Sequence, residues 1–207
     1  MKSDRGSARR KRTYRMGARA RSVEETRERI LRAAHALWLD LPYDDVTLDQ
    51  VAERAGVSKQ TVLRLFTSKD RLAFAVVDWQ QPREEAARDA QPGDFRAAVT
   101  RLVDRYEQMG DANVRVLDLE RRVPAVRYLL VQARESHRQW VERVFAPCLP
   151  ARRGAAHRRR VLALYAATEV MLWKLLRRDF ELSRAETEAV IHELIGGLIC
   201  AAEKEKS

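Results

Sequence analysis

Residues 47–69, with the sequence TLDQVAERAGVSKQTVLRLFTSK, decide the fold of the amino-terminal part of the chain. Within them, Ala52 is followed by Gly56 and then by Val62. A small residue such as Ala52 lets two helices cross closely, and glycine readily adopts the left-handed conformation that a tight turn requires. Val62 can fill the angle between the helices. The spacing therefore predicts two helices joined by a short turn.

Capping residues indicate where both helices begin. Thr47 and Gln50 have the spacing of a capping box at the start of the first helix, and Ser58 is a suitable N-cap for the second. An ordinary helical hairpin has the same outline, but a helix-turn-helix exposes its second helix to the major groove of DNA. The residues expected to contact DNA are Thr47, Ser58, Lys59, Gln60, Thr61, Arg64 and Lys69.

Residues 26–72 resemble the amino-terminal domain of the tetracycline-repressor (TetR) family of bacterial regulators. The family pattern has an alanine-rich first helix, the motif AGVS at the turn and a lysine that opens the next helix. The matching positions are Tyr43, Thr47, Ala55 to Ser58, Thr61, Phe66 and Lys69. Leu63 and Leu65 depart from it, since the family usually has tyrosine and often histidine there, both of which touch DNA phosphates. The resemblance implies a DNA-binding regulator that forms a homodimer.

The composition indicates an all-α fold. Apolar residues make up 45% of 207 residues, and they recur at intervals of three and four along most of the chain. We expect an amino-terminal three-helix helix-turn-helix domain and a carboxy-terminal helical domain for ligand binding and dimerisation. The boundaries are a basic disordered arm (1–21), the DNA-binding domain (22–68), a connecting helix (69–92) and the effector-binding and dimerisation domain (93–207).

The positive charge of the chain is concentrated in the arm. Residues 1–21 contain nine basic residues and one acidic residue, which gives +8 of the total formal charge of +10. Such an arm beside a DNA-binding unit is expected to follow the phosphate backbone of the DNA, and the alternative is a solvated tail.

Two further helix starts are expected from capping boxes. One is at Ser22 with Glu25, and the other is near Lys69, where Thr67 and Asp70 form the box.

The carboxy-terminal part is expected to hold further helices. They are placed after Asp94, near residues 112–120, after Pro124, at 158–178 and after Ser183, while Pro82 is expected to kink or end the connecting helix. The last two helices are apolar over more of their circumference than the others, and the final one contains the pair Gly196-Gly197. We expect these two helices to form the homodimer interface as a four-helix arrangement.

An effector site is expected among the helices of the carboxy-terminal domain. Its candidate lining residues, which are also plausible as plain core, are Tyr106, Met109, His137, Trp140, Tyr165, Glu169 and Trp173. Glu169 falls four residues from both Tyr165 and Trp173, so in one continuous helix the three share a face. A carboxylate there needs a cation, either an arginine of a neighbouring helix or subunit, or a flat cationic effector.

The favoured function is a transcriptional repressor that a small molecule releases from a double-stranded DNA operator. The alternative is a nucleoid-bound structural or adaptor protein of the same fold without an effector. An enzyme has little support, because the histidines and cysteines are scattered and the sequence has neither a glycine-rich phosphate loop nor a metal-spaced pair. We expect no cofactor or metal. Cys148 and Cys200 are expected to be reduced thiols in a cytoplasmic, nucleoid-associated protein without a membrane segment.

Overall fold

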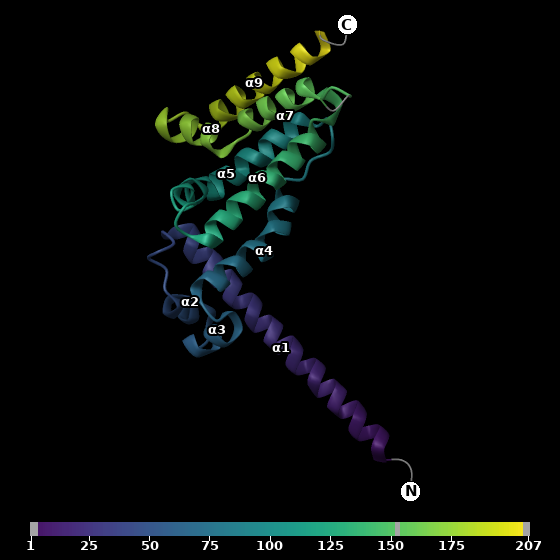
Figure 1. The fold of residues 1–207 in the computed structure, drawn as a ribbon, viewed down its shortest axis with the longest axis vertical. Coiled ribbons are helices and arrows are strands. Elements are labelled where there is room, and N and C mark those ends of the chain that lie inside the picture. Colours follow the sequence, from purple (N-terminus) through teal and green to yellow (C-terminus); the bar gives the residue numbers. More distant parts are fainter. Residues whose placement is uncertain (1–3, 152–153, 205–207) are drawn as a thin grey trace. The chain divides into compact units, whose positions relative to one another are not determined.

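The computed structural model describes residues 4–151 and 154–204 (Figure 1). Every regular element in these ranges is a helix, which confirms the prediction of an all-α fold. The chain divides after Val76 into two compact units, and this boundary lies inside α4 (Lys69–Ala87). Each unit contains its own set of buried apolar side chains.

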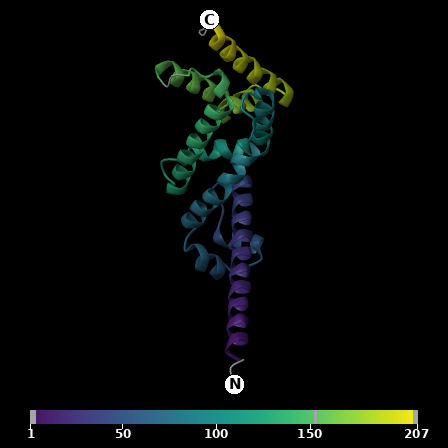
Figure 2. The same cartoon turned by 90° about the vertical axis from the view of Figure 1, so that its right-hand side faces the viewer.

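The first unit contains α1 (Asp4–Asp40), α2 (Leu48–Ala55), α3 (Lys59–Phe66) and the beginning of α4. Figure 2 shows α1 as one long helix, and its later residues pack against α2. Apolar residues recur along one side of each helix, so their burial holds the short helices α2 and α3 in place. The buried residues that form this core include Ile30, Leu31, Ala34, Val51, Val62, Phe66 and Leu72.

The start of α1 differs from the sequence prediction. Residues 4–21, expected as a disordered arm, belong to the helix, and Ser22 lies inside it instead of capping it. The carbonyl of Ser22 accepts a hydrogen bond of 2.8 Å from the Thr26 hydroxyl one turn later. Arginine and alanine, which dominate this stretch, favour helix, and no proline interrupts it. Residues 1–3 of the expected arm lie outside the described residues.

The turn between α2 and α3 has the predicted chemistry. Thr47 and Gln50 form the capping box of α2, and Gly56 ends that helix with φ 65°. The hydroxyl of Ser58 accepts a hydrogen bond from the amide of Thr61 and caps α3. The expected cap of α4 is displaced by one residue, because Thr67 ends α3 with φ 63° and Ser68 instead accepts from the amide of Arg71.

The second unit contains the rest of α4 followed by helices that pack around α5. They are α5 (Phe95–Leu117), α6 (Pro124–Val144), the 3-10 turn η1 (Ala146–Cys148), α7 (Ala155–Ala167), α8 (Val170–Lys174), the π-helical turn η2 (Leu175–Asp179) and α9 (Arg184–Lys204). Contacts join α5 to α6, α8 and α9, and the core between them includes Leu102, Phe145, Leu164, Trp173 and Ile191.

Three helix boundaries differ from those predicted from the sequence. Helix α4 continues past Pro82 to Ala87, so this proline does not end the helix, and whether it kinks it stays a prediction. Helix α5 continues through Gly110 to Leu117, so the short helix expected at 112–120 is not separate. Position 110 requires glycine because the ring of Trp173 lies where the Cβ atom of any other residue would be. The helix expected at 158–178 is broken between α7 and α8, and Ser183 with Glu186 caps α9 as predicted.

Candidate nucleic-acid interface and interior polar cluster

Helix α3 has one buried side and one exposed side. Val62 and Phe66 are buried against the rest of the unit, whereas Gln60 and Arg64 are exposed. Arg64 forms no ion pair within the part of the chain that the structure describes, so its guanidinium is available for an external acceptor. Leu63 is also exposed and places an apolar side chain on the same helix. The exposed residues of α3 can therefore reach base edges in a major groove.

Two other candidate residues of α3 already have partners. The ammonium of Lys59 lies 2.8 Å from a carboxylate oxygen of Asp49 on α2, and both side chains are exposed. Exposed ion pairs contribute about 0–1 kcal/mol, so a phosphate can displace Asp49 at little cost. The hydroxyl of Thr61, which is half-buried, lies 3.0 Å from that of Ser58. These two hydroxyls fix the first turn of α3, while Lys59 can exchange its carboxylate partner for another anion.

Lys69 is positioned by the loop that precedes α2. Its ammonium lies 4.4 Å from the ring centroid of Tyr43 and donates a hydrogen bond of 3.3 Å to the carbonyl of Asp44. Partial burial lowers the pKa of Lys69, and the nearby carboxylates oppose that effect. Tyr43 is itself held by a 2.5 Å hydrogen bond to Asp70, and its burial together with this carboxylate raises its pKa. The cation at the start of α4 is thus held in a defined place.

The second unit contains an interior polar cluster formed by Arg88, Ser136, His137 and Thr168. The Nδ1 atom of His137 lies 3.2 Å from a guanidinium nitrogen of Arg88, and Nε2 lies 3.0 Å from the hydroxyl of Thr168. Arg88 also donates to the hydroxyl of Ser136 at 3.2 Å. The residues come from α6, from the segment after α4 and from the end of α7, so the cluster joins three parts of the unit.

Aromatic rings surround this cluster. His137 stacks on Trp140 with ring centroids 5.4 Å apart and forms a T-shaped pair with Tyr165, whose ring centroid lies 4.7 Å away. The hydroxyl of Tyr106 donates a hydrogen bond of 2.9 Å to the carbonyl of Thr168. The structure therefore brings together four of the residues predicted to line an effector site, and it places them beside the break between α7 and α8.

Glu169 does not share a helical face with Tyr165 and Trp173, contrary to the prediction. It lies in the break with an extended backbone, so Tyr165, Glu169 and Trp173 do not follow one continuous helix. Its carboxylate accepts a hydrogen bond of 2.6 Å from the amide of Met171 and caps α8. The charge of Glu169 acts on the neighbouring Tyr165, whose pKa is raised first by burial and then by this carboxylate. The side chain is half-buried and retains access to its surroundings.

Trp140 and Trp173, two more of the predicted lining residues, have polar partners within the second unit. The indole of Trp140 donates to the carbonyl of Arg88, and that of Trp173, fully buried, donates to Glu107, each at 2.9 Å. Arg177 pairs with the same carboxylate at 2.7 Å, and this ion pair lowers the pKa of Glu107. Met109 is half-buried on α5. The two indoles therefore pack in the core with hydrogen-bond partners of their own, and their part in an effector site stays a prediction.

A protein-family comparison identifies the amino-terminal unit. The family described as bacterial regulatory proteins, tetR family, matches residues 30–76, which include α2, α3 and their turn. The amino-terminal unit is thus similar to that of the tetR-family regulators. The curated regulator TcmR of Streptomyces glaucescens, described as an HTH-type transcriptional regulator, is 31% identical over 98 residues. That match covers 42% of this chain and 43% of TcmR, so the chain spans less than half of the length of that relative.

Solved structures of tetR-family regulators share the fold over most of the chain. A regulator from Streptomyces coelicolor aligns with a TM-score of 0.70 and 16% identity, covering 87% of this chain and 89% of its own. NalD, the secondary repressor of the MexAB-OprM multidrug efflux pump in Pseudomonas aeruginosa, aligns with a TM-score of 0.53 and 20% identity over 84% and 97%. At these identities the likeness concerns the fold.

Sequence reasoning missed Asp49, Arg88 and Thr168. Asp49 pairs with Lys59 across the turn, and Arg88 and Thr168 complete the interior polar cluster. Each contact joins residues too distant in sequence for periodicity to reveal, and only the acidic first turn of α2 gave a local signal for Asp49. No helix in the described ranges is both long and apolar enough to span a membrane.

Proposed function

We propose that this protein is a tetR-family regulator, a homodimeric repressor that leaves its DNA operator when a small molecule binds in its carboxy-terminal unit. The observation that carries the DNA-binding part is the geometry of α3, which Ser58 caps and Val62 anchors while Gln60 and Arg64 stay exposed. Thr47 and Lys69 would contact phosphates at the starts of α2 and α4, where free backbone amides also favour anions.

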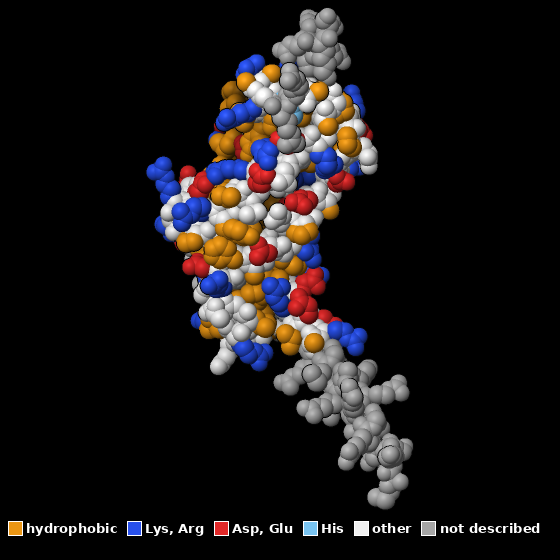
Figure 3. Space-filling model, turned by 45° about the vertical axis from the view of Figure 1, so that its right-hand side comes forward, with side chains coloured by type: hydrophobic (Ala, Val, Ile, Leu, Met, Phe, Trp, Pro, Cys, Tyr) orange, Lys and Arg blue, Asp and Glu red, His pale blue; other side chains and the backbone are white. Residues whose placement is uncertain are grey.

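Dimerisation through the carboxy-terminal helices is supported by exposed apolar side chains. Leu162, Met171, Leu175 and Leu194 are each at least 40% exposed and lie on α7, α8, η2 and α9. Figure 3 shows hydrophobic side chains among the blue and red ones of this part of the chain. Gly197 has open space where a Cβ would stand, so a partner helix can approach its backbone closely. Such a group of apolar residues is typical of an interface.

The effector would bind beside the break between α7 and α8. Tyr106, His137 and Tyr165 meet there with Thr168, and the half-buried Glu169 adds a negative charge. A ligand that inserts into this cluster must disturb the contact of His137 with Arg88, which directly follows α4. Since α4 continues into the DNA-binding unit, a shift of its end can change the spacing of two recognition helices in a dimer.

The sign of regulation is proposed as repression, the function that NalD, a protein of similar fold, is described as having. A footprint on the DNA upstream of the protein's own gene tests binding, with the Arg64→Ala protein as a control for recognition by α3. A thermal-shift screen of small molecules, followed by the same footprint with each hit, tests release. If no hit weakens the footprint, a DNA-binding protein without an effector is the better description.

A further inference from the structure

Asp49 lies where two features that attract a phosphate meet. It belongs to the first turn of α2, directly after the N-cap Thr47, and the helix dipole favours a negative charge there. Its carboxylate also lies 2.8 Å from the ammonium of Lys59, the first residue of α3. The protein therefore places a carboxylate of its own where the start of α2 and Lys59 would otherwise attract a phosphate.

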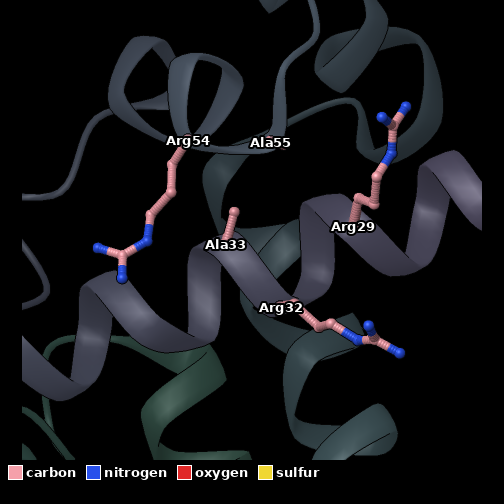
Figure 4. A pocket seen from close by; sticks show the side chains of 5 residues that line it. All are labelled: Arg29, Arg32, Ala33, Arg54 and Ala55. Carbon is pink, nitrogen blue, oxygen red and sulfur yellow. The ribbon is translucent and has the colours of Figure 1, made fainter.

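The partner of this carboxylate is Lys59 and not the cation of α2 itself. Arg54 is the basic residue of α2, and it lies in the last turn, at the opposite end from Asp49. Figure 4 shows its side chain turned toward α1, where it lines a hollow and approaches Asp40 at 4.0 Å. The side chains of Lys59 and Asp49 are 51% and 66% exposed, so their ion pair is hydrated and can open.

Carboxylates accompany the cations expected at phosphates but not the side chains expected at bases. Lys59 has Asp49, and Lys69 feels the carboxylates of the neighbouring loop and of the start of α4. Gln60 and Arg64 are exposed on α3, and Arg64 forms no ion pair within the described part of the chain. Phosphate contacts supply affinity without sequence information, whereas base contacts supply specificity. The carboxylates therefore oppose the sequence-independent part of DNA binding.

We propose that Asp49 is a specificity-determining residue, which withholds Lys59 from phosphates until α3 meets its matching bases. This inference rests on the proposed function, in which α3 reads the operator. On an unrelated duplex, Gln60 and Arg64 find no matching bases, so α3 has no fixed register and Lys59 keeps the partner in its own chain. On the operator, base contacts hold α3 in one register, and a phosphate held beside Lys59 then replaces Asp49.

Weaker binding to unrelated DNA raises specificity directly. Electrostatic contacts supply nearly all of the affinity for unrelated sequences, and such sites vastly outnumber an operator in a genome. A carboxylate beside the phosphates removes one cation from these contacts and adds a repulsion of like charges. Asp49 therefore lowers the affinity for unrelated DNA more than the affinity for the operator.

The test compares two variants of the full chain that lose the same charge from the same helix. Asp49→Asn keeps the size of the side chain and leaves the capping box of Thr47 and Gln50 in place. Glu53→Gln is the control, because Glu53 is exposed one turn later and Lys59 pairs with Asp49 instead. Both substitutions are also made together with Lys59→Ala. Circular dichroism verifies each fold, and binding to a random duplex and to the footprinted operator is measured over a range of salt concentrations.

We expect Asp49→Asn to bind the random duplex about three- to tenfold more tightly than Glu53→Gln, the range of one exposed charge pair with its repulsion. Its logarithmic salt slope on that duplex should be steeper by about 0.9 per subunit, because Lys59 gains a phosphate contact. The affinity for the operator should change less, so the ratio of the two affinities falls. Without Lys59, the two substitutions should have equal effects.

The proposal is overturned if both variants bind the random duplex with the same affinity and slope, or if their difference persists without Lys59. It is also overturned if the operator gains as much affinity as the random duplex, since Asp49 then weakens all DNA binding alike. Failure of the proposed operator recognition is seen separately, because the wild type would bind both duplexes alike and Arg64→Ala would change neither. The random-duplex comparison needs no operator and still decides whether Asp49 withholds Lys59 from phosphates.

Discussion

The Nδ1 atom of His137 lies 3.2 Å from the guanidinium of Arg88, and this contact fixes the tautomer of the buried imidazole. A guanidinium can only donate, so Nδ1 must accept and the ring proton must reside on Nε2. Nε2 then donates to the hydroxyl of Thr168 at 3.0 Å, and that hydroxyl donates onward to the carbonyl of Leu164 at 2.8 Å. The ring is neutral and every polar atom in this sequence of contacts has a partner.

The neutral state of His137 predicts a pH-dependent stability. Burial, followed by the charge of Arg88, lowers its pKa from 6.5 to about 3. Between these two values only the unfolded chain takes up the proton, so the free energy of unfolding falls as the pH falls from 6.5 toward 3. At about pH 5 this residue costs about 2 kcal/mol relative to pH 7.5, since each pH unit corresponds to about 1.4 kcal/mol. Above pH 6.5 it contributes no pH dependence.

Urea unfolding of the wild-type and His137→Gln proteins at about pH 7.5 and pH 5 measures this effect. We expect the wild type to lose more stability than the variant, and the difference between them removes the contributions of other titrating groups. A ring resonance of His137 that titrates near its ordinary pKa in the folded protein contradicts the prediction.

Features that depend on residues close together in the sequence were predicted correctly, whereas contacts between distant residues were not. Thr47, Gly56 and Ser58 were placed correctly because caps and tight turns depend on residues within a few positions of each other. The break at Thr168 was missed because apolar residues keep a helical spacing through it. Its stabilising contacts come from Tyr106 and His137, which are remote in the sequence. Of the interior polar cluster, the sequence therefore predicted His137 and neither its polar partners nor their arrangement.

Arg64→Ala and Lys69→Ala are expected to affect DNA binding differently. Arg64 is exposed on α3, where a bidentate contact with guanine contributes about 1–3 kcal/mol, so its loss should relax the preference at one base pair. Lys69 is fixed against Tyr43 at the start of α4, so its loss should weaken all sequences alike. Binding to a panel of singly substituted operators measures both. Unchanged affinity and base preference in Arg64→Ala would show that α3 reads DNA through other residues.

Gly110→Ala is expected to destabilise the carboxy-terminal unit. A methyl group at this position overlaps the ring of Trp173, which is fully buried and anchored to Glu107. Overpacking of a core costs about 1–3 kcal/mol, and here it must displace a ring that α8 holds against α5. Thermal unfolding measures the cost. The double variant Gly110→Ala with Trp173→Leu should lose less stability than the sum of the single variants, and strict additivity would mean that the two residues do not conflict.

Leu194→Glu is expected to convert the proposed dimer to a monomer. The side chain is 44% exposed on α9, so a carboxylate there remains hydrated in a single chain and becomes buried only at an interface. Val131→Glu on α6 is the matched control, because Val131 is 52% exposed outside the proposed interface. Analytical ultracentrifugation of both variants measures the oligomeric state. The interface lies elsewhere if both proteins sediment as the wild type does.

Glu169→Gln is expected to separate a ligand-binding role from a structural one. The amide oxygen of glutamine can still accept the hydrogen bond from Met171, so the cap of α8 is retained and only the charge is lost. If Glu169 meets a flat cationic effector beside Tyr165, the variant should fold and bind DNA normally but no longer respond to cationic ligands. If its charge instead pairs with an arginine of another subunit, the dimer or the melting temperature should fall while the ligand response persists.

The control for this experiment is Glu135→Gln, which removes the same charge from the exposed face of α6, where Glu135 pairs with Arg138. Melting temperature, sedimentation and ligand-dependent DNA release are measured for both variants in parallel. A general effect of net charge would change the two proteins equally. A loss of response confined to Glu169→Gln requires the carboxylate at the break between α7 and α8, whereas full response in both variants removes Glu169 from the effector site and leaves it as the cap of α8.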